Sequence, residues 1–89
     1  MRLEFDPESG ALYIRVREGE VEETLGLAEP GFGAYMDVDR EGNVLGLEFL
    51  SFDEYAKLVT RFGGTLELPE RVEAPASFRL DPASIPPNP

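Results

Sequence analysis

The prolines of this chain are distributed unevenly, and their distribution limits how much of the chain can fold regularly. Of the eight prolines, only Pro7 and Pro30 precede residue 69, and the other six lie in residues 69–89. Proline fixes φ and lacks a backbone N–H, so it interrupts helices and central strands. The distribution predicts one folded domain over residues 1–68, followed by an extended proline-rich tail over residues 69–89. A chain of 89 residues is long enough for a single modest core.

Polar and apolar residues alternate with a period of two through much of the body, which is typical of strands. The clearest strand is residues 11–17, where Leu12, Ile14 and Val16 share one face. The Glu18-Gly19 pair favours a tight hairpin that returns as residues 20–27. This hairpin places Val16 opposite Val21, and residues 2–5 form a further strand before it.

A second hairpin is expected from residues 34–38 and 43–50, joined by a four-residue loop at 39–42. This loop length places Met36 opposite Leu45, so that apolar residues face each other. Residues 43–50 carry apolar side chains at both odd and even positions, which is typical of a strand covered on both faces.

A helix is expected over residues 51–62. Ser51 and Glu54 form a capping-box signature, and apolar residues follow at helical spacing to Phe62. Gly63-Gly64 supplies a C-terminal stop. The expected fold is therefore α+β: an antiparallel β-meander of about five strands with one C-terminal helix on one face, then the extended tail.

Two segments of the sequence resemble a known family. Residues 5–15 combine an Asp-Pro-Glu-Ser-Gly turn with an Ala-Leu-Tyr-Ile strand, and residues 36–50 combine an acidic turn with a Gly-Leu-Glu strand. Together they resemble the small acidic prokaryotic proteins catalogued as domain of unknown function 2283, over residues 3–58. The resemblance implies a compact β-rich domain and brings no established activity with it.

Composition excludes several classes of function. Eighteen acidic residues against eight basic ones give a net charge of −10, so the footprint of a nucleic-acid-binding protein is absent. The chain contains no cysteine and no histidine, which excludes disulfides, thiolate zinc sites and a histidine base. No apolar run reaches the length that spans a bilayer. We therefore expect a cytoplasmic protein without a cofactor, and no residue stands out as catalytic.

One motif raises a metal-binding alternative. Asp37, Asp39, Glu41 and Glu48 nearly fit the ligand spacing of an EF-hand calcium loop, with Gly42 at the turn position. The flanks read as strands, whereas an EF-hand needs helices on both sides. A turn closing a hairpin explains the same residues without an ion. Calcium or small-ligand binding by the acidic hairpin at 37–48 is the alternative to an interaction module.

Protein interaction is the function that the sequence favours. One helix covers only one face of the sheet, so the other face is expected to carry an apolar strip, and exposed strips of this kind mark interfaces. The strip should favour a homodimer, and the acidic surface could also receive a basic protein partner. The tail would dock either on its own body or on a second subunit. The expected interface residues are Tyr13, Tyr35, Val44 and Leu50 in the body, with Phe78, Leu80 and Ile85 in the tail.

Overall fold

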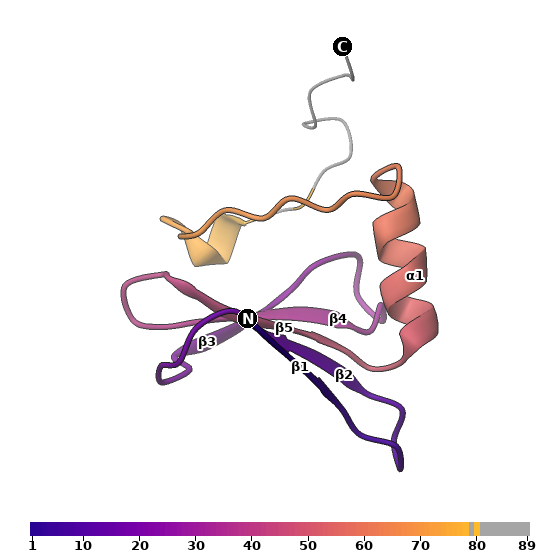
Figure 1. Ribbon diagram of the computed structural model, residues 1–89. Coiled ribbons are helices and arrows are strands. Elements are labelled where there is room, and N and C mark those ends of the chain that lie inside the picture. Colours follow the sequence, from indigo (N-terminus) through magenta and orange to yellow (C-terminus); the bar gives the residue numbers. More distant parts are fainter. Residues whose placement is uncertain (79, 81–89) are drawn as a thin grey trace.

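The five expected strands form one antiparallel sheet, and the expected helix covers one of its faces (Figure 1). The computed structural model describes residues 1–78 and 80. The sheet order is β1-β2-β5-β4-β3. This confirms the predicted fold class of an antiparallel sheet followed by one helix. The elements are β1 (Arg2–Phe5), β2 (Leu12–Arg15), β3 (Glu23–Gly26), β4 (Ala34–Val38), β5 (Val44–Phe49), α1 (Phe52–Arg61) and a short 3-10 turn, η1 (Pro75–Ser77).

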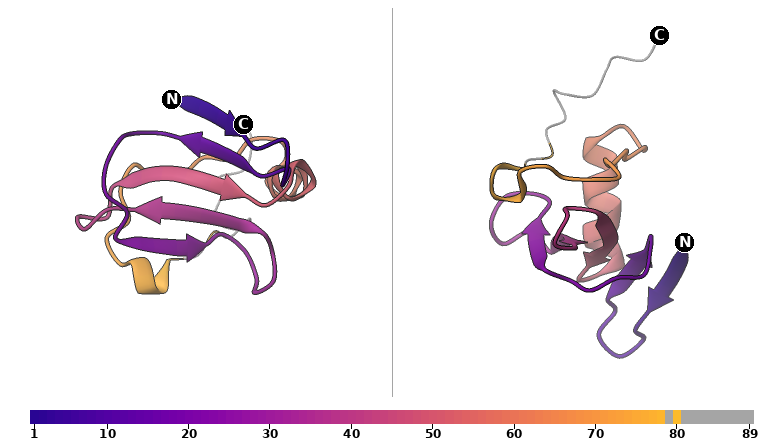
Figure 2. Two further views of the ribbon diagram at one scale, coloured as in Figure 1. Left: turned by 90° about the horizontal axis from the view of Figure 1, so that it is seen from below. Right: turned by 90° about the vertical axis from the view of Figure 1, so that its left-hand side faces the viewer.

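The hairpin expected around Glu18-Gly19 does not form, and that prediction is wrong. β2 pairs with β1 and β5, while β3 lies at the opposite edge of the sheet (Figure 2). The segment between β2 and β3 crosses the end of β5, where the N–H groups of Val16 and Arg17 donate to Leu45 O at 2.8 and 3.1 Å. β5 displaces β3 as the partner of β2 because it offers a longer buried strand of apolar residues.

The β4–β5 hairpin forms with a different register from the expected one. Met36 pairs with Leu47 in place of Leu45, and Val38 pairs with Val44. The expected four-residue loop is wrong, because Asp39 N–H donates to Asn43 O at 3.0 Å and only three residues lie between them, which shifts the register by one residue. Leu45 is the extra residue of a β-bulge, which shifts the register by a second residue and restores the facing of the apolar side chains. The bulge explains why Val44 and Leu45 are both buried, at 3% and 1% exposure.

The helix begins and ends close to the predicted bounds. The Ser51 hydroxyl accepts a hydrogen bond from Glu54 N–H at 3.2 Å, which confirms Ser51 as the N-cap. The Glu54 carboxylate does not complete the capping box; it accepts from Gly33 N–H at 3.3 Å and so ties the helix to the loop before β4. Phe62 is the C-cap.

The core lies between the sheet and a layer formed by α1 and the segment that follows it (Figure 1). Phe49 of β5 is fully buried and meets Tyr55 of α1 edge to face at 5.3 Å. Beyond residue 68, Val72 is 6% exposed and belongs to the same core. The first part of the tail therefore packs on its own body, across the sheet. Across residues 1–78 and 80, no helix has the length and apolar character needed to cross a membrane.

Candidate interaction surfaces

The sheet face opposite α1 is polar at its centre. The Tyr13 hydroxyl donates to Asp37 Oδ2 at 2.9 Å across β5, and Thr24 Oγ1 donates to Asp37 Oδ1 at 2.6 Å. Gly46 lies beneath the Tyr13 ring, and any side chain there would collide with it. Burial, then the hydrogen bond and charge of Asp37, raise the pKa of Tyr13 to about 12. Three strands are thus joined by one hydrogen-bonded cluster.

This face does not gather the four body residues expected to form an apolar strip. Tyr13 and Tyr35 lie on it and are half-buried. Val44 faces the core because of the bulge, so its expected place on this face is wrong. Leu50 follows β5, is 50% exposed, and lies against Gly33.

The tail residues expected at the interface have a different position. Phe78 and Leu80 are partly buried and pack against the core of their own chain. Ile85 lies outside the described residues. Of the two arrangements that the sequence left open, the structure shows docking on the chain's own body for the part of the tail it describes.

The four carboxylates of the calcium alternative do not converge on one point. Asp37 is held by Tyr13 and Thr24 on the sheet face, and Asp39 accepts from Asn43 N–H at 2.8 Å and Asn43 Nδ2 at 3.0 Å in the turn. The Asn43 side chain, with backbone N–H groups of the same turn, holds the pKa of Asp39 below its ordinary value. In the described part of the chain, no group of three or more possible ligands is arranged to hold a metal ion.

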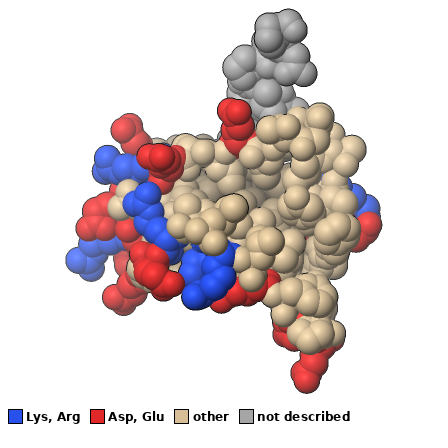
Figure 3. Space-filling model, in the orientation of Figure 1, with Lys and Arg blue, Asp and Glu red and all other residues tan. Residues whose placement is uncertain are grey.

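Charged side chains of both signs gather at one end of the sheet (Figure 3). Glu20 and Glu22 share a hollow of about 350 Å³ with Asp39, Arg40 and Glu41. Further carboxylates flank it, and the tail reaches the same end through the bridge between Asn43 and Arg71. We call this surface the acidic end; its eight carboxylates are Glu18, Glu20, Glu22, Glu23, Asp39, Glu41, Glu70 and Glu73, and its four guanidinium groups are Arg2, which lies 3.7 Å from Glu18, Arg17, Arg40 and Arg71.

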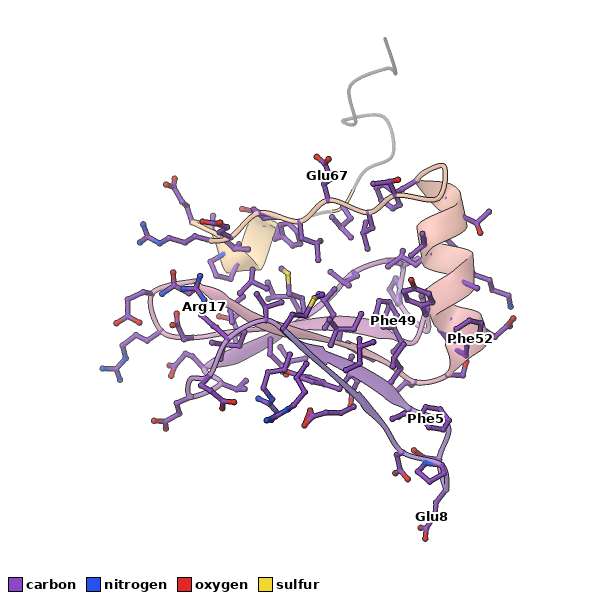
Figure 4. The ribbon with its side chains drawn as sticks, in the orientation of Figure 1. Phe5, Glu8, Arg17, Phe49, Phe52 and Glu67 are labelled. Atoms are coloured by element: carbon purple, nitrogen blue, oxygen red, sulfur yellow. The ribbon has the colours of Figure 1, made fainter. Side chains whose placement is uncertain are left out.

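Apolar side chains are exposed at the β1 edge of the sheet. Leu3 is 67% exposed and Phe5 is 61% exposed. β1 pairs only with β2 among the described residues, so one side of its backbone has no strand partner. Figure 4 shows Phe5 on the β1–β2 hairpin, which projects away from the layer formed by α1 and the tail. Sequence reasoning missed this surface, although the Leu3/Phe5 alternation in the first strand was its signal.

A cavity of about 590 Å³ lies between the loop before β4 and the C-terminal half of α1. Arg61 lines this cavity, and its guanidinium group donates to both carboxylate oxygens of Glu29 at 2.7 and 2.8 Å. The same group lies 4.6 Å from the centre of the Phe32 ring. The hydrogen bonds from Arg61 lower the pKa of Glu29 to about 2. Leu80, the last residue that the structure describes, also lines this cavity.

Comparison with known families decides the relationship of the chain. The model of the family described as "Protein of unknown function (DUF2283)" matches residues 2–52, which is more than half of the chain. The chain belongs to the DUF2283 family. The matched DUF2283 region contains all five strands and ends as α1 begins. No curated protein and no solved structure matches the chain in these comparisons. The polar cluster, the acidic end and the β1 edge all lie within, or are built largely from, the DUF2283 region.

Proposed function

We propose that this protein is a small acidic interaction module of the prokaryotic cytoplasm that forms a homodimer and binds a basic protein partner. The acidic end is the observation that supports binding of a basic partner. Eight carboxylates lie there with four guanidinium groups, so the surface is negative. Complementary fields between such a surface and a basic one accelerate association and select partners. A partner with clustered lysine or arginine side chains fits this surface.

The two loops at the acidic end, residues 16–22 and 39–43, suit it to binding. Backbone contacts hold them in place: Glu22 N–H donates to Val38 O at 2.9 Å, and Gly42 N–H donates to Asp39 O at 3.0 Å. The carboxylates of Glu20, Glu22 and Glu41 nevertheless stay exposed. Charges on an ordered backbone lose less conformational freedom on binding than charges on a free chain.

Support for a homodimer comes from the exposed apolar residues of β1. A large apolar side chain exposed next to an unpaired strand edge favours association between chains. A body of this size also gains stability from oligomerisation.

A matched pair of charge variants tests the basic partner. A partner is captured from native extract at low salt on the immobilised full chain, purified, and its affinity measured. We expect Glu20→Gln/Glu22→Gln to weaken binding by about 2- to 30-fold, from roughly 0.2–1 kcal/mol per exposed pair. The control, Glu8→Gln/Glu67→Gln, removes the same charge from exposed sites that Figure 4 shows away from the acidic end. Equal weakening by both variants would refute a role for the acidic end.

A further inference from the structure

The open side of β1 carries free backbone groups at two defined residues. Asp6 N–H donates to Ala11 O at 2.9 Å, so this pair is a hydrogen-bonded pair of the β1–β2 ladder. In an antiparallel ladder, hydrogen-bonded and non-hydrogen-bonded pairs alternate. The backbone groups of Arg2 and Glu4 therefore point toward β2. Those of Leu3 and Phe5 point outward, where no described strand receives them.

The same two residues carry the exposed apolar side chains. Leu3 pairs with Ile14 and Phe5 pairs with Leu12, so all four share one face of the sheet. Ile14 and Leu12 are partly buried and pack against the core. Leu3 and Phe5, at 67% and 61% exposure, continue this apolar surface to the edge. A strand added to this edge would cover side chains and satisfy backbone groups together.

We propose that a second copy of this chain pairs antiparallel along β1, with Leu3 opposite Leu3 of the second copy. The inference rests on the self-association proposed above and names its surface. Two sheets then join into one of ten strands, and the Leu3 N–H of each copy donates to the Leu3 carbonyl of the other. Both β1 edges are consumed, so the two-fold contact closes at a dimer.

Charge selects this register over its neighbour. In an antiparallel pair, side chains directly opposite each other point to the same face of the sheet. When the two strands are identical and related by a two-fold axis, one residue must therefore lie opposite its own copy, and for β1 we compare Leu3 and Glu4 in that position. About Leu3, each Arg2 lies opposite Glu4 of the other copy, and opposite charges across strands stabilise the pair. About Glu4, two glutamates oppose each other. Asp6, which would then face Arg2, already accepts hydrogen bonds from Glu8 N–H and Ser9 Oγ, both at 3.0 Å.

The existing ion pairs of β1 are compatible with the Leu3 register. Glu4 lies 3.3 Å from both Arg2 and Arg15 of its own chain, so two cations flank one carboxylate. When Glu4 of the other copy approaches Arg2, the first Glu4 therefore still has Arg15 as a partner. The contact is short, at four residues a strand, and falls below the ~1,200 Å² of a stable complex. We therefore expect a reversible dimer whose population rises with concentration.

The absence of cysteine makes disulfide trapping a direct test of the register. Leu3→Cys places two sulfurs across a pair with Cα atoms about 5.5 Å apart, which suits a disulfide. Phe5→Cys is the matched control, because it has similar exposure but its copies lie four residues apart, about 13 Å. The full chain is used without an N-terminal tag. Mild oxidation followed by non-reducing electrophoresis should give covalent dimer at least tenfold faster for Leu3→Cys.

The outcomes separate this proposal from the proposed function. Sedimentation of the unmodified chain over a concentration series reports self-association itself, and a monomer throughout would overturn both the proposed homodimer and the β1 contact. A dimer in which Leu3→Cys reacts no faster than Phe5→Cys would overturn the β1 contact alone, and fastest trapping by Glu4→Cys would overturn the register. Leu3→Ser should weaken the dimer at least tenfold, while Val21→Ser, which alters another exposed apolar residue without changing the net charge, should leave it unchanged. Equal effects of the two serines would also overturn the β1 contact.

Discussion

At the scale of single residues, two glycines hold the structure at points where a side chain cannot fit. Gly46 admits the Tyr13 ring against β5, which lets Tyr13 reach Asp37. Gly42 has φ of +87° in the acidic turn, and its carbonyl accepts a hydrogen bond from Val72 N–H at 2.7 Å. Gly42 is thus both a turn residue and the place where the tail joins the body.

Gly42→Ala should be strongly destabilising. Alanine costs roughly 1–2 kcal/mol at positive φ, and its Cβ would also collide with the Val72 carbonyl oxygen, adding about 1–3 kcal/mol. Gly31→Ala is the matched control, since Gly31 has φ of +92° and open space around it, so that only the backbone cost applies. Urea unfolding of both variants gives the difference. Equal losses of stability would show that the contact with Val72 does not constrain the tail.

The Tyr13 hydroxyl supplies a pH-dependent prediction. Its pKa is raised to about 12 by burial and by Asp37, above the ordinary value of 10. Between these values the unfolded chain releases this proton and the folded chain keeps it, so the free energy of unfolding should fall as pH rises above 10. Asp37→Asn should move the phenolate titration of Tyr13 to lower pH. The titration is followed by phenolate absorbance, with Tyr13→Phe identifying the signal; no movement would refute the role of Asp37.

At the scale of elements, the features predicted from sequence are those that depend on local chemistry. α1 was predictable because its cap, Ser51, and its apolar face lie within a few residues of each other. The pairing of β2 with β5 was not predictable, because the Glu18-Gly19 turn signal is local whereas the preference of β2 for β5 comes from contacts more than thirty residues apart. The predicted register of the β4–β5 pair was wrong for a related reason. The bulge at Leu45 moves Val44 from the expected interface to the core, and no local pattern predicts a bulge there.

The segment after α1 shows the same division between local and distant causes. Its prolines correctly exclude long regular elements, and η1 is the one short helix among its described residues. Its docking on the sheet depends on Val72 reaching a space left between α1 and the β4–β5 turn, which no local pattern reveals. The composition predicted an acidic surface, but only the structure shows that carboxylates from separate loops lie together at one end of the sheet.

At the scale of the whole molecule, the charge of −10 affects the two proposed associations in opposite ways. Two identical acidic chains repel each other at long range, and the β1 contact must overcome this repulsion through backbone hydrogen bonds and apolar burial. A basic partner is attracted by the same field. Salt screens both interactions, with a Debye length of about 10 Å at 0.1 M.

Added sodium chloride should therefore strengthen the homodimer and weaken the complex with the basic partner. Arg2 and Glu4 attract each other across the dimer contact, but this exposed pair is a small term beside the repulsion between two whole chains. Sedimentation over a salt series measures the dimer, and a binding assay over the same series measures the complex. The Glu20→Gln/Glu22→Gln variant should dimerise more readily at low salt and bind the partner less. If both associations weakened as salt rose, attraction between charges would hold the dimer together, and apolar pairing along β1 would not be its main driving force.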